Sequence, residues 1–150
     1  ALQVAHHLAP GLRATFVTHS PTVAVALAQH PGVDIIMLGG RLYRHSMVNV
    51  GAAVIAAVAQ YRADLFFMGV TGVHPEAGLS TGDAEEAEVK RALAARAAET
   101  VVLASSEKLM AASPFVIAPA SAMATLVVPH GAPAATLRSF RKLGVTVQTT

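Results

Sequence analysis

Four polar or glycine-rich junctions carry residue types that could hold an anionic ligand, and each follows an apolar run that predicts a β-strand. The junctions are Thr18-His19-Ser20, Gly39-Gly40-Arg41, Gly69-Val70-Thr71-Gly72 and Ser105–Lys108. In an open α/β sheet, ligands bind beyond the carboxyl ends of the parallel strands. If the strands are parallel, these junctions all lie on one edge of the sheet, and we expect them to form a ligand site there.

The first junction combines hydroxyl groups with a predicted helix start. Ser20 followed by Pro21 is typical of an N-cap and the first helical position. Backbone N–H groups at a helix start attract anions, and the hydroxyls of Thr18 and Ser20 could add donors. The alternative is that Ser20 only caps its own helix, and the residues alone leave both interpretations open.

Basic side chains stand in the second and fourth junctions. The planar guanidinium of Arg41 suits phosphate or carboxylate, and Lys108 could hold phosphate as a point charge. The alternatives are a tight glycine turn with a solvated arginine, and a solvated loop lysine. The third junction, Gly69 to Gly72, lacks the G-x-G-x-x-G spacing of dinucleotide sites, so no nucleotide cofactor is predicted.

Two further charges, Glu86 and Lys90, belong to a helix that Asp83 is expected to cap in a capping-box pattern with Glu86. Val89 and Leu93 define the apolar face of this helix, and Glu86 points close to that face. A carboxylate there could receive sugar hydroxyls. The alternative is an ordinary ion pair at positions i and i+4, which stabilises a helix by only about 0.2–0.5 kcal/mol.

Strands alternate with helices along the chain, and the strands are continuous apolar runs. The expected helices are Ala1–Leu8, Pro21–Gln29, Met47–Tyr61 with Ser46 or Asn49 as its cap, Asp83–Ala98 and Pro133–Leu143. The expected strands are Ala14–Thr18, Val33–Leu38, Leu65–Val70, Thr100–Ala104, Ala124–Val128 and Val145–Gln148, with Pro114–Pro119 as an edge strand and His74–Gly82 as a loop. This pattern predicts an α/β fold with a mostly parallel sheet and helices on both faces.

Composition limits the classes of function. The 150 residues predict one domain over 1–150, and 53% hydrophobic with 13% charged residues allow a substantial core. A formal charge of +2 without a basic run argues against nucleic-acid binding by this chain itself. The absence of cysteine excludes disulfides, and the seven histidines show no metal-ligand spacing. No apolar run reaches membrane-spanning length and no signal peptide is evident, so a cytoplasmic location without membrane contact is expected.

Three short motifs identify a family. The chain has Asp64 before the apolar run, then Gly69-Val70-Thr71-Gly72-Val73, Gly78-Leu79-Ser80-Thr81 and Glu86-Ala87-Glu88-Val89-Lys90-Arg91-Ala92. These resemble the C-terminal sensor domain of DeoR-type transcriptional repressors. The resemblance implies a ribose-5-phosphate-isomerase/CoA-transferase-like fold that binds a phosphorylated sugar or related metabolite. It also implies a homo-oligomer whose DNA contacts come from an N-terminal winged helix-turn-helix domain outside this chain.

The resemblance bears on individual residues. The family often has T-N-S where this chain has Thr18-His19-Ser20, so His19 replaces asparagine. It has G-G-x, often followed by a basic residue, at Gly39-Gly40-Arg41, and A-D-x-S-K where Lys108 matches the lysine and Ser105 replaces the aspartate. Family members carry a strand and a D-x-G-[ST]-T loop just before the first helix. Their absence here implies that the chain is a fragment lacking part of the sheet and of the phosphate site.

Two other functions remain open from the sequence. The first is a sugar-phosphate isomerase-like enzyme on the same fold, with Glu86 as the base. The replacement at Ser105 and the missing loop argue against it, because an acid is lost. The second is an interaction module whose Ala- and Val-rich helix, Ala52–Ala59, packs in an oligomer.

Overall fold

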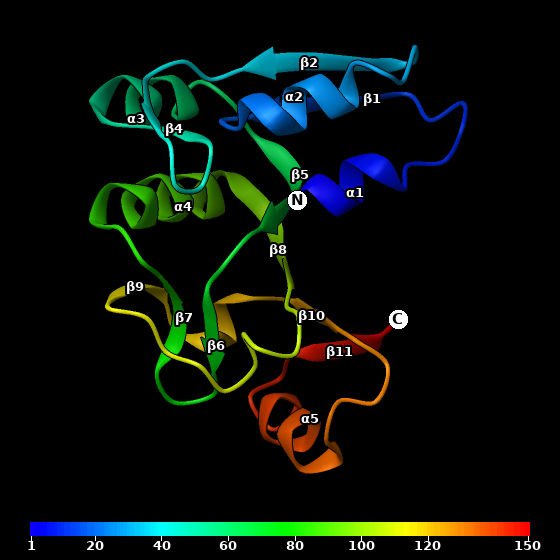
Figure 1. The fold of residues 1–150 in the computed structure, drawn as a ribbon, viewed down its shortest axis with the longest axis vertical. Coiled ribbons are helices and arrows are strands. Elements are labelled where there is room, and N and C mark those ends of the chain that lie inside the picture. The colour runs from blue at the N-terminus through cyan, green and yellow to red at the C-terminus, as the bar shows by residue number, and fades with distance from the viewer. The chain divides into compact units, whose positions relative to one another are not determined.

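A computed structural model describes residues 1–150, and it divides them into two units, Ala1–Gln60 and Tyr61–Thr150. The expectation of one domain over the whole chain stays a prediction. In the first unit, strands β1 (Ala14–Thr18) and β2 (Val33–Met37) pair in parallel, so that Thr18 lies opposite Met37 (Figure 1). Helices α1 (Leu2–His6) and α2 (Pro21–Leu27) contribute Ala5 and Leu27 to a small core.

The expected helix Met47–Tyr61 is wrong in its first part. Strands β3 (Arg41–Tyr43) and β4 (Val48–Val50) form an antiparallel hairpin, and the helix α3 covers only Ala52–Val58. The valines of β4 are β-branched and favour a strand, whereas the alanine-rich segment after them favours a helix. Gly51 separates the two elements with a φ of +107°, which L side chains rarely adopt.

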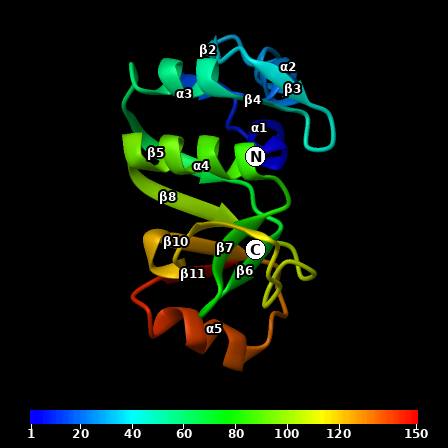
Figure 2. The ribbon, with the colours of Figure 1, turned by 90° about the vertical axis from the view of Figure 1, so that its left-hand side faces the viewer.

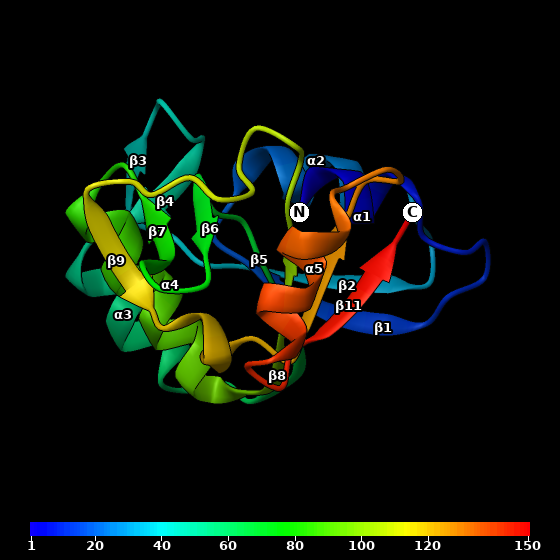
Figure 3. The same ribbon diagram turned by 90° about the horizontal axis from the view of Figure 1, so that it is seen from below.

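The second unit confirms the expected α/β class with a four-stranded parallel sheet flanked by helices. Its strands follow the order β11 (Thr146–Thr149), β10 (Thr125–Val128), β8 (Ala97–Leu103) and β5 (Ala63–Met68). Figure 3 shows β10 and β11 side by side, and Figure 2 shows α5 (Ala134–Arg141), which connects them. Helix α4 (Ala84–Arg96) ends directly at β8, so the predicted end at Ala98 is two residues too far.

A three-stranded antiparallel sheet replaces the loop expected over His74–Gly82. Its order is β6 (Gly72–His74), β7 (Gly78–Thr81) and β9 (Phe115–Ala118), followed by a 3₁₀ turn over Ala120–Ala122. The hairpin between β6 and β7 closes through His74 Nδ1, which accepts the N–H groups of Glu76 and Ala77. Strand β9 lies at the sheet edge between two prolines, as expected, and the Arg91 guanidinium donates to the Val116 carbonyl there.

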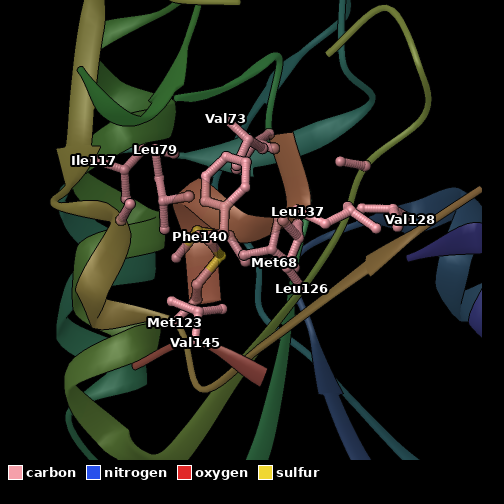
Figure 4. Close-up of a cluster of buried hydrophobic side chains, with 14 of the residues drawn as sticks. Met68, Val73, Leu79, Ile117, Met123, Leu126, Val128, Leu137, Phe140 and Val145 are labelled. Carbon is pink, nitrogen blue, oxygen red and sulfur yellow. The ribbon is translucent and has the colours of Figure 1, made fainter. Parts of the chain in front are cut away.

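One hydrophobic core organises the second unit. Figure 4 shows its side chains, among them Met68 of β5, Leu79 of β7, Leu126 of β10 and Phe140 of α5, all of them 1% exposed or less. The core thus joins the parallel sheet and the antiparallel sheet of this unit to helices α4 and α5. None of the helices in the chain combines the length and the apolar character that crossing a lipid bilayer requires.

We predict that Phe140→Ala lowers the free energy of unfolding by about 3–5 kcal/mol, because it leaves a cavity where the ring is fully buried. Urea denaturation followed by circular dichroism measures this. Leu143→Ala is the matched control, since that side chain is 40% exposed and its loss should cost under about 1 kcal/mol. Equal losses in the two variants would contradict the described core.

Candidate functional site

The two junctions of the first unit lie side by side at the carboxyl ends of β1 and β2. The Leu38 N–H donates to the Thr18 carbonyl at 2.8 Å. Asn49 joins them further, because its N–H donates to the His19 carbonyl at 2.7 Å and its Nδ2 donates to the Leu38 carbonyl at 2.8 Å. Asn49 is buried and was expected only as a helix cap. Its bridging role depends on the hairpin, which the sequence pattern did not reveal.

Local backbone groups use the hydroxyls of the first junction. Ser20 Oγ accepts from the Val23 N–H and donates to the Met47 carbonyl, and Thr18 Oγ1 accepts from the Ser20 N–H. The predicted N-cap at Ser20 is therefore confirmed. Whether Thr18, His19 and Ser20 also contact a ligand stays a prediction.

The glycines and the arginine of the second junction have different surroundings. A Cβ at Gly39 would meet open space, whereas one at Gly40 would lie 2.6 Å from Val54 Cγ2, so Gly40 is needed for packing. Arg41 begins β3 and is exposed. Contact of this junction with a ligand also stays a prediction.

In the second unit, the loop after β5 shows the same contrast. A Cβ at Gly69 would meet nothing within 4 Å, whereas one at Gly72 would lie 2.6 Å from both the Ala111 carbonyl and Ser80 Oγ. Close backbone packing thus explains Gly72, while Gly69 leaves space. Between them, Thr71 is exposed and its N–H donates to the Ser80 carbonyl at 3.0 Å.

The segment of residues 105–113 carries Lys108 along strand β6. The Val73 N–H donates to the Lys108 carbonyl at 2.9 Å, and the Met110 N–H donates to the Val73 carbonyl at 2.7 Å. Parallel pairing of β5 with β8 places the start of this segment beside the loop that begins at Gly69. Within the segment, Ser105 Oγ donates to the Glu107 carboxylate and lowers its pKa.

Glu86 and Lys90 form a buried ion pair on helix α4. Lys90 Nζ lies 2.9 Å from Glu86 Oε1, and the residues are 6% and 4% exposed. Asp83 Oδ2 accepts the Glu86 N–H at 3.0 Å, which confirms Asp83 as the N-cap. The ion pair expected at positions i and i+4 is therefore present, and it is buried rather than exposed on the helix surface. Whether Glu86 and Lys90 contact a ligand stays a prediction.

The pKa of the Lys90 ammonium is lowered, chiefly by burial; the Glu86 carboxylate opposes this shift, and the positive charge of Lys108 adds to it. The cluster of Glu86, Lys90 and Lys108 combines two lysines with one carboxylate. Such a cluster can hold an anion and accept hydrogen bonds from hydroxyl groups.

Thr81, at the end of β7, was not predicted as a site residue. Its Oγ1 is buried and has no hydrogen-bond partner. Buried polar groups without partners are rare and cost about 1–3 kcal/mol each.

No group of three or more His, Asp or Glu side chains is arranged to bind a metal ion.

Comparison with known proteins identifies the family. Residues 1–130 match the family model described as "DeoR C terminal sensor domain". Because the match covers most of the chain, this protein belongs to the DeoR C-terminal sensor domain family. The family resemblance expected from the motifs is thereby confirmed.

Relatives of this chain are named as transcriptional repressors. It is 32% identical over 131 residues to the "Putative aga operon transcriptional repressor" of Escherichia coli O157:H7, covering 87% of this chain and 49% of the relative. It is 32% identical over 95 residues to the HTH-type transcriptional repressor GlcR of Bacillus subtilis, with coverage of 63% and 36%. It is 29% identical over 92 residues to the Glycerol-3-phosphate regulon repressor of Haemophilus influenzae, with coverage of 61% and 36%.

This chain therefore matches about half or less of the length of these relatives. The family match and the names of the relatives identify a regulatory sensor domain rather than an isomerase-like enzyme.

We predict that the buried ion pair behaves as a unit. Lys90→Met or Glu86→Gln alone should lower the free energy of unfolding by about 3–5 kcal/mol, because each leaves a buried charge without the opposite charge beside it. The double variant should lose clearly less than the sum, as urea denaturation at pH 7 can measure. Glu88→Gln on the exposed side of α4 is the control and should change stability by under about 0.5 kcal/mol. Additive single losses would contradict this coupling.

We also predict that Gly72→Ala and Gly69→Ala differ. The first should lower the free energy of unfolding by about 1–3 kcal/mol, because its Cβ overlaps the Ala111 carbonyl and Ser80 Oγ. The second should change it by under about 1 kcal/mol, because the Cβ meets open space. Denaturation of the two variants under identical conditions checks this, and a costlier change at Gly69 would be inconsistent with the described loop.

Proposed function

We propose that this chain senses a phosphorylated sugar or related phosphorylated metabolite for a DeoR-family transcriptional regulator. The single observation that carries the proposal is the cluster of Glu86, Lys90 and Lys108. It combines two lysines with a carboxylate, and the segment that carries Lys108 begins beside a loop that leaves space at Gly69. A phosphate group and a set of hydroxyls are the chemical complement of that combination.

Each residue of the cluster has a defined role in the proposal. Lys108, only partly buried, holds the phosphate as a point charge. Glu86 accepts hydrogen bonds from sugar hydroxyls. Lys90 orients Glu86, and a phosphate nearby favours the charged form that burial disfavours. Thr71 is exposed at the same loop and adds a hydroxyl.

The first unit carries a second group of predicted effector contacts, and the proposal treats this group separately from the cluster. The members of this group are Thr18, His19, Ser20, Gly39, Gly40 and Arg41. Arg41 is the one among them whose charge suits a phosphate directly.

The names of two relatives support this reading. One is a Glycerol-3-phosphate regulon repressor, and glycerol 3-phosphate is a small phosphorylated polyol derivative. The relative GlcR is named as an HTH-type repressor, which fits a DNA-binding helix-turn-helix domain outside this chain. Regulation then requires that the effector bind two states of a homo-oligomer with different affinity. Such a regulator acts in the cytoplasm, where phosphorylated metabolites and DNA meet.

We predict that one member of a panel of sugar phosphates raises the unfolding temperature of this chain, whereas the unphosphorylated sugars do not. A ligand at 100 times its Kd adds about 2.7 kcal/mol, which thermal denaturation detects readily. Lys108→Ala should weaken binding and so reduce the shift at the same ligand concentration. Lys142→Ala, which removes an exposed lysine at the end of α5, is the matched control and should retain it.

If no phosphorylated metabolite shifts the unfolding temperature of this chain, the proposed function is wrong.

A further inference from the structure

Ser80 on strand β7 forms hydrogen bonds with two separate segments of the second unit. The residue is 1% exposed, and its carbonyl accepts the Thr71 N–H at 3.0 Å. Its side-chain Oγ accepts the Ser113 N–H at 2.8 Å, across 33 residues of sequence. Ser80 thus touches both the loop after β5 and the far end of the 105–113 segment.

The same residues close a network of hydrogen bonds. Ser80 Oγ accepts the backbone N–H of Ser113, and Ser113 Oγ is hydrogen-bonded to Thr71 Oγ1. Ser113 therefore links the buried Ser80 to the exposed Thr71. Ser80 Oγ also lies against Gly72, where a Cβ would come within 2.6 Å of it. The network therefore fixes how far the 105–113 segment stands from β7.

Three contacts hold the 105–113 segment. The first is the pair of backbone hydrogen bonds with Val73, which any residue can make. The second is the bond from the Ser113 N–H to Ser80 Oγ, and the third joins Ser113 Oγ to Thr71 Oγ1. Lys108 lies within this segment, so the position of its backbone depends on these contacts. A displacement of about 1 Å is enough to weaken a positioned contact severely.

We propose that Ser80 is a positioning residue of the effector site, which sets the places of Lys108 and Thr71 without touching the ligand. This inference rests on the proposed function for the ligand, but its geometric part concerns the chain alone. The role of Ser80 in this proposal goes beyond forming strand β7. It needs a hydroxyl that accepts the Ser113 N–H, and alanine has none.

Amide hydrogen exchange tests the geometric part without any ligand. In Ser80→Ala, the Ser113 and Met110 N–H groups should exchange at least about 10-fold faster, because the segment loses its hydrogen bond to Ser80 Oγ. Ser80→Thr keeps the hydroxyl and should restore protection. Ser139→Ala is the control, since that hydroxyl bonds only to Thr136 within its own helix. Unchanged exchange of Met110 in Ser80→Ala would overturn the proposal.

A double-mutant cycle tests the functional part, with inorganic phosphate as the probe in titration calorimetry. Ser80→Ala should weaken phosphate binding about 5-fold in the unaltered chain and less than 2-fold in a Lys108→Ala background. A role in global stability alone would give the same factor in both backgrounds. Equal factors, or no change in either background, would overturn the proposal.

The two readouts separate the two ideas. If the unaltered chain binds no phosphate, the proposed function loses its support, while the exchange of Met110 still decides whether Ser80 anchors the segment. If phosphate binds and the exchange of Met110 is unaffected by Ser80→Ala, the proposed function stands and the positioning role is wrong.

Discussion

The site of the second unit depends on an ammonium and a carboxylate held 2.9 Å apart with almost no access to water. Removing two ions from water costs several kcal/mol each, and their attraction repays this only when the geometry is favourable. Apolar side chains of similar size would often fill such a position with equal or better stability. The pair Glu86–Lys90 is therefore weak evidence for stability, and contact with a ligand is the role that we propose for it.

The parallel pairing of β5 with β8 brings together the two loops that follow these strands. Because β5 and β8 run in the same direction, the chain leaves both strands at the same edge, and the two following loops become neighbours. The small antiparallel sheet then holds these loops from one side through the backbone of Val73 and through both the carbonyl and the hydroxyl of Ser80. The first unit repeats the principle on a smaller scale, with Asn49 joining the ends of β1 and β2.

Features encoded within a few residues were predictable from the sequence. The N-caps at Ser20 and Asp83, the edge strand between two prolines and the parallel strands all follow from local residue patterns. The hairpin over 41–50 was missed because Ser46 and Asn49 resemble helix N-caps ahead of an alanine-rich segment, although Gly51 separates β4 from the helix. The candidate site was predictable only as a set of residue types, and not as contacts between those residues. The bonds of Asn49 and Ser80 span 11 and 33 residues, and the burial of Lys90 depends on elements that pack around α4.

Arg91 belongs to the motif that marks the family, yet its guanidinium ends on the backbone rather than at the ion pair. It donates to the Val116 carbonyl of β9, the outermost strand of the small sheet. Phe115 and Val116 are 41% and 56% exposed, so this edge would otherwise resemble a template on which a strand from another molecule could add. Arg91 thereby joins the family motif on α4 to this edge strand, and a charged side chain at an exposed edge is one of the ways in which proteins limit the addition of a further strand.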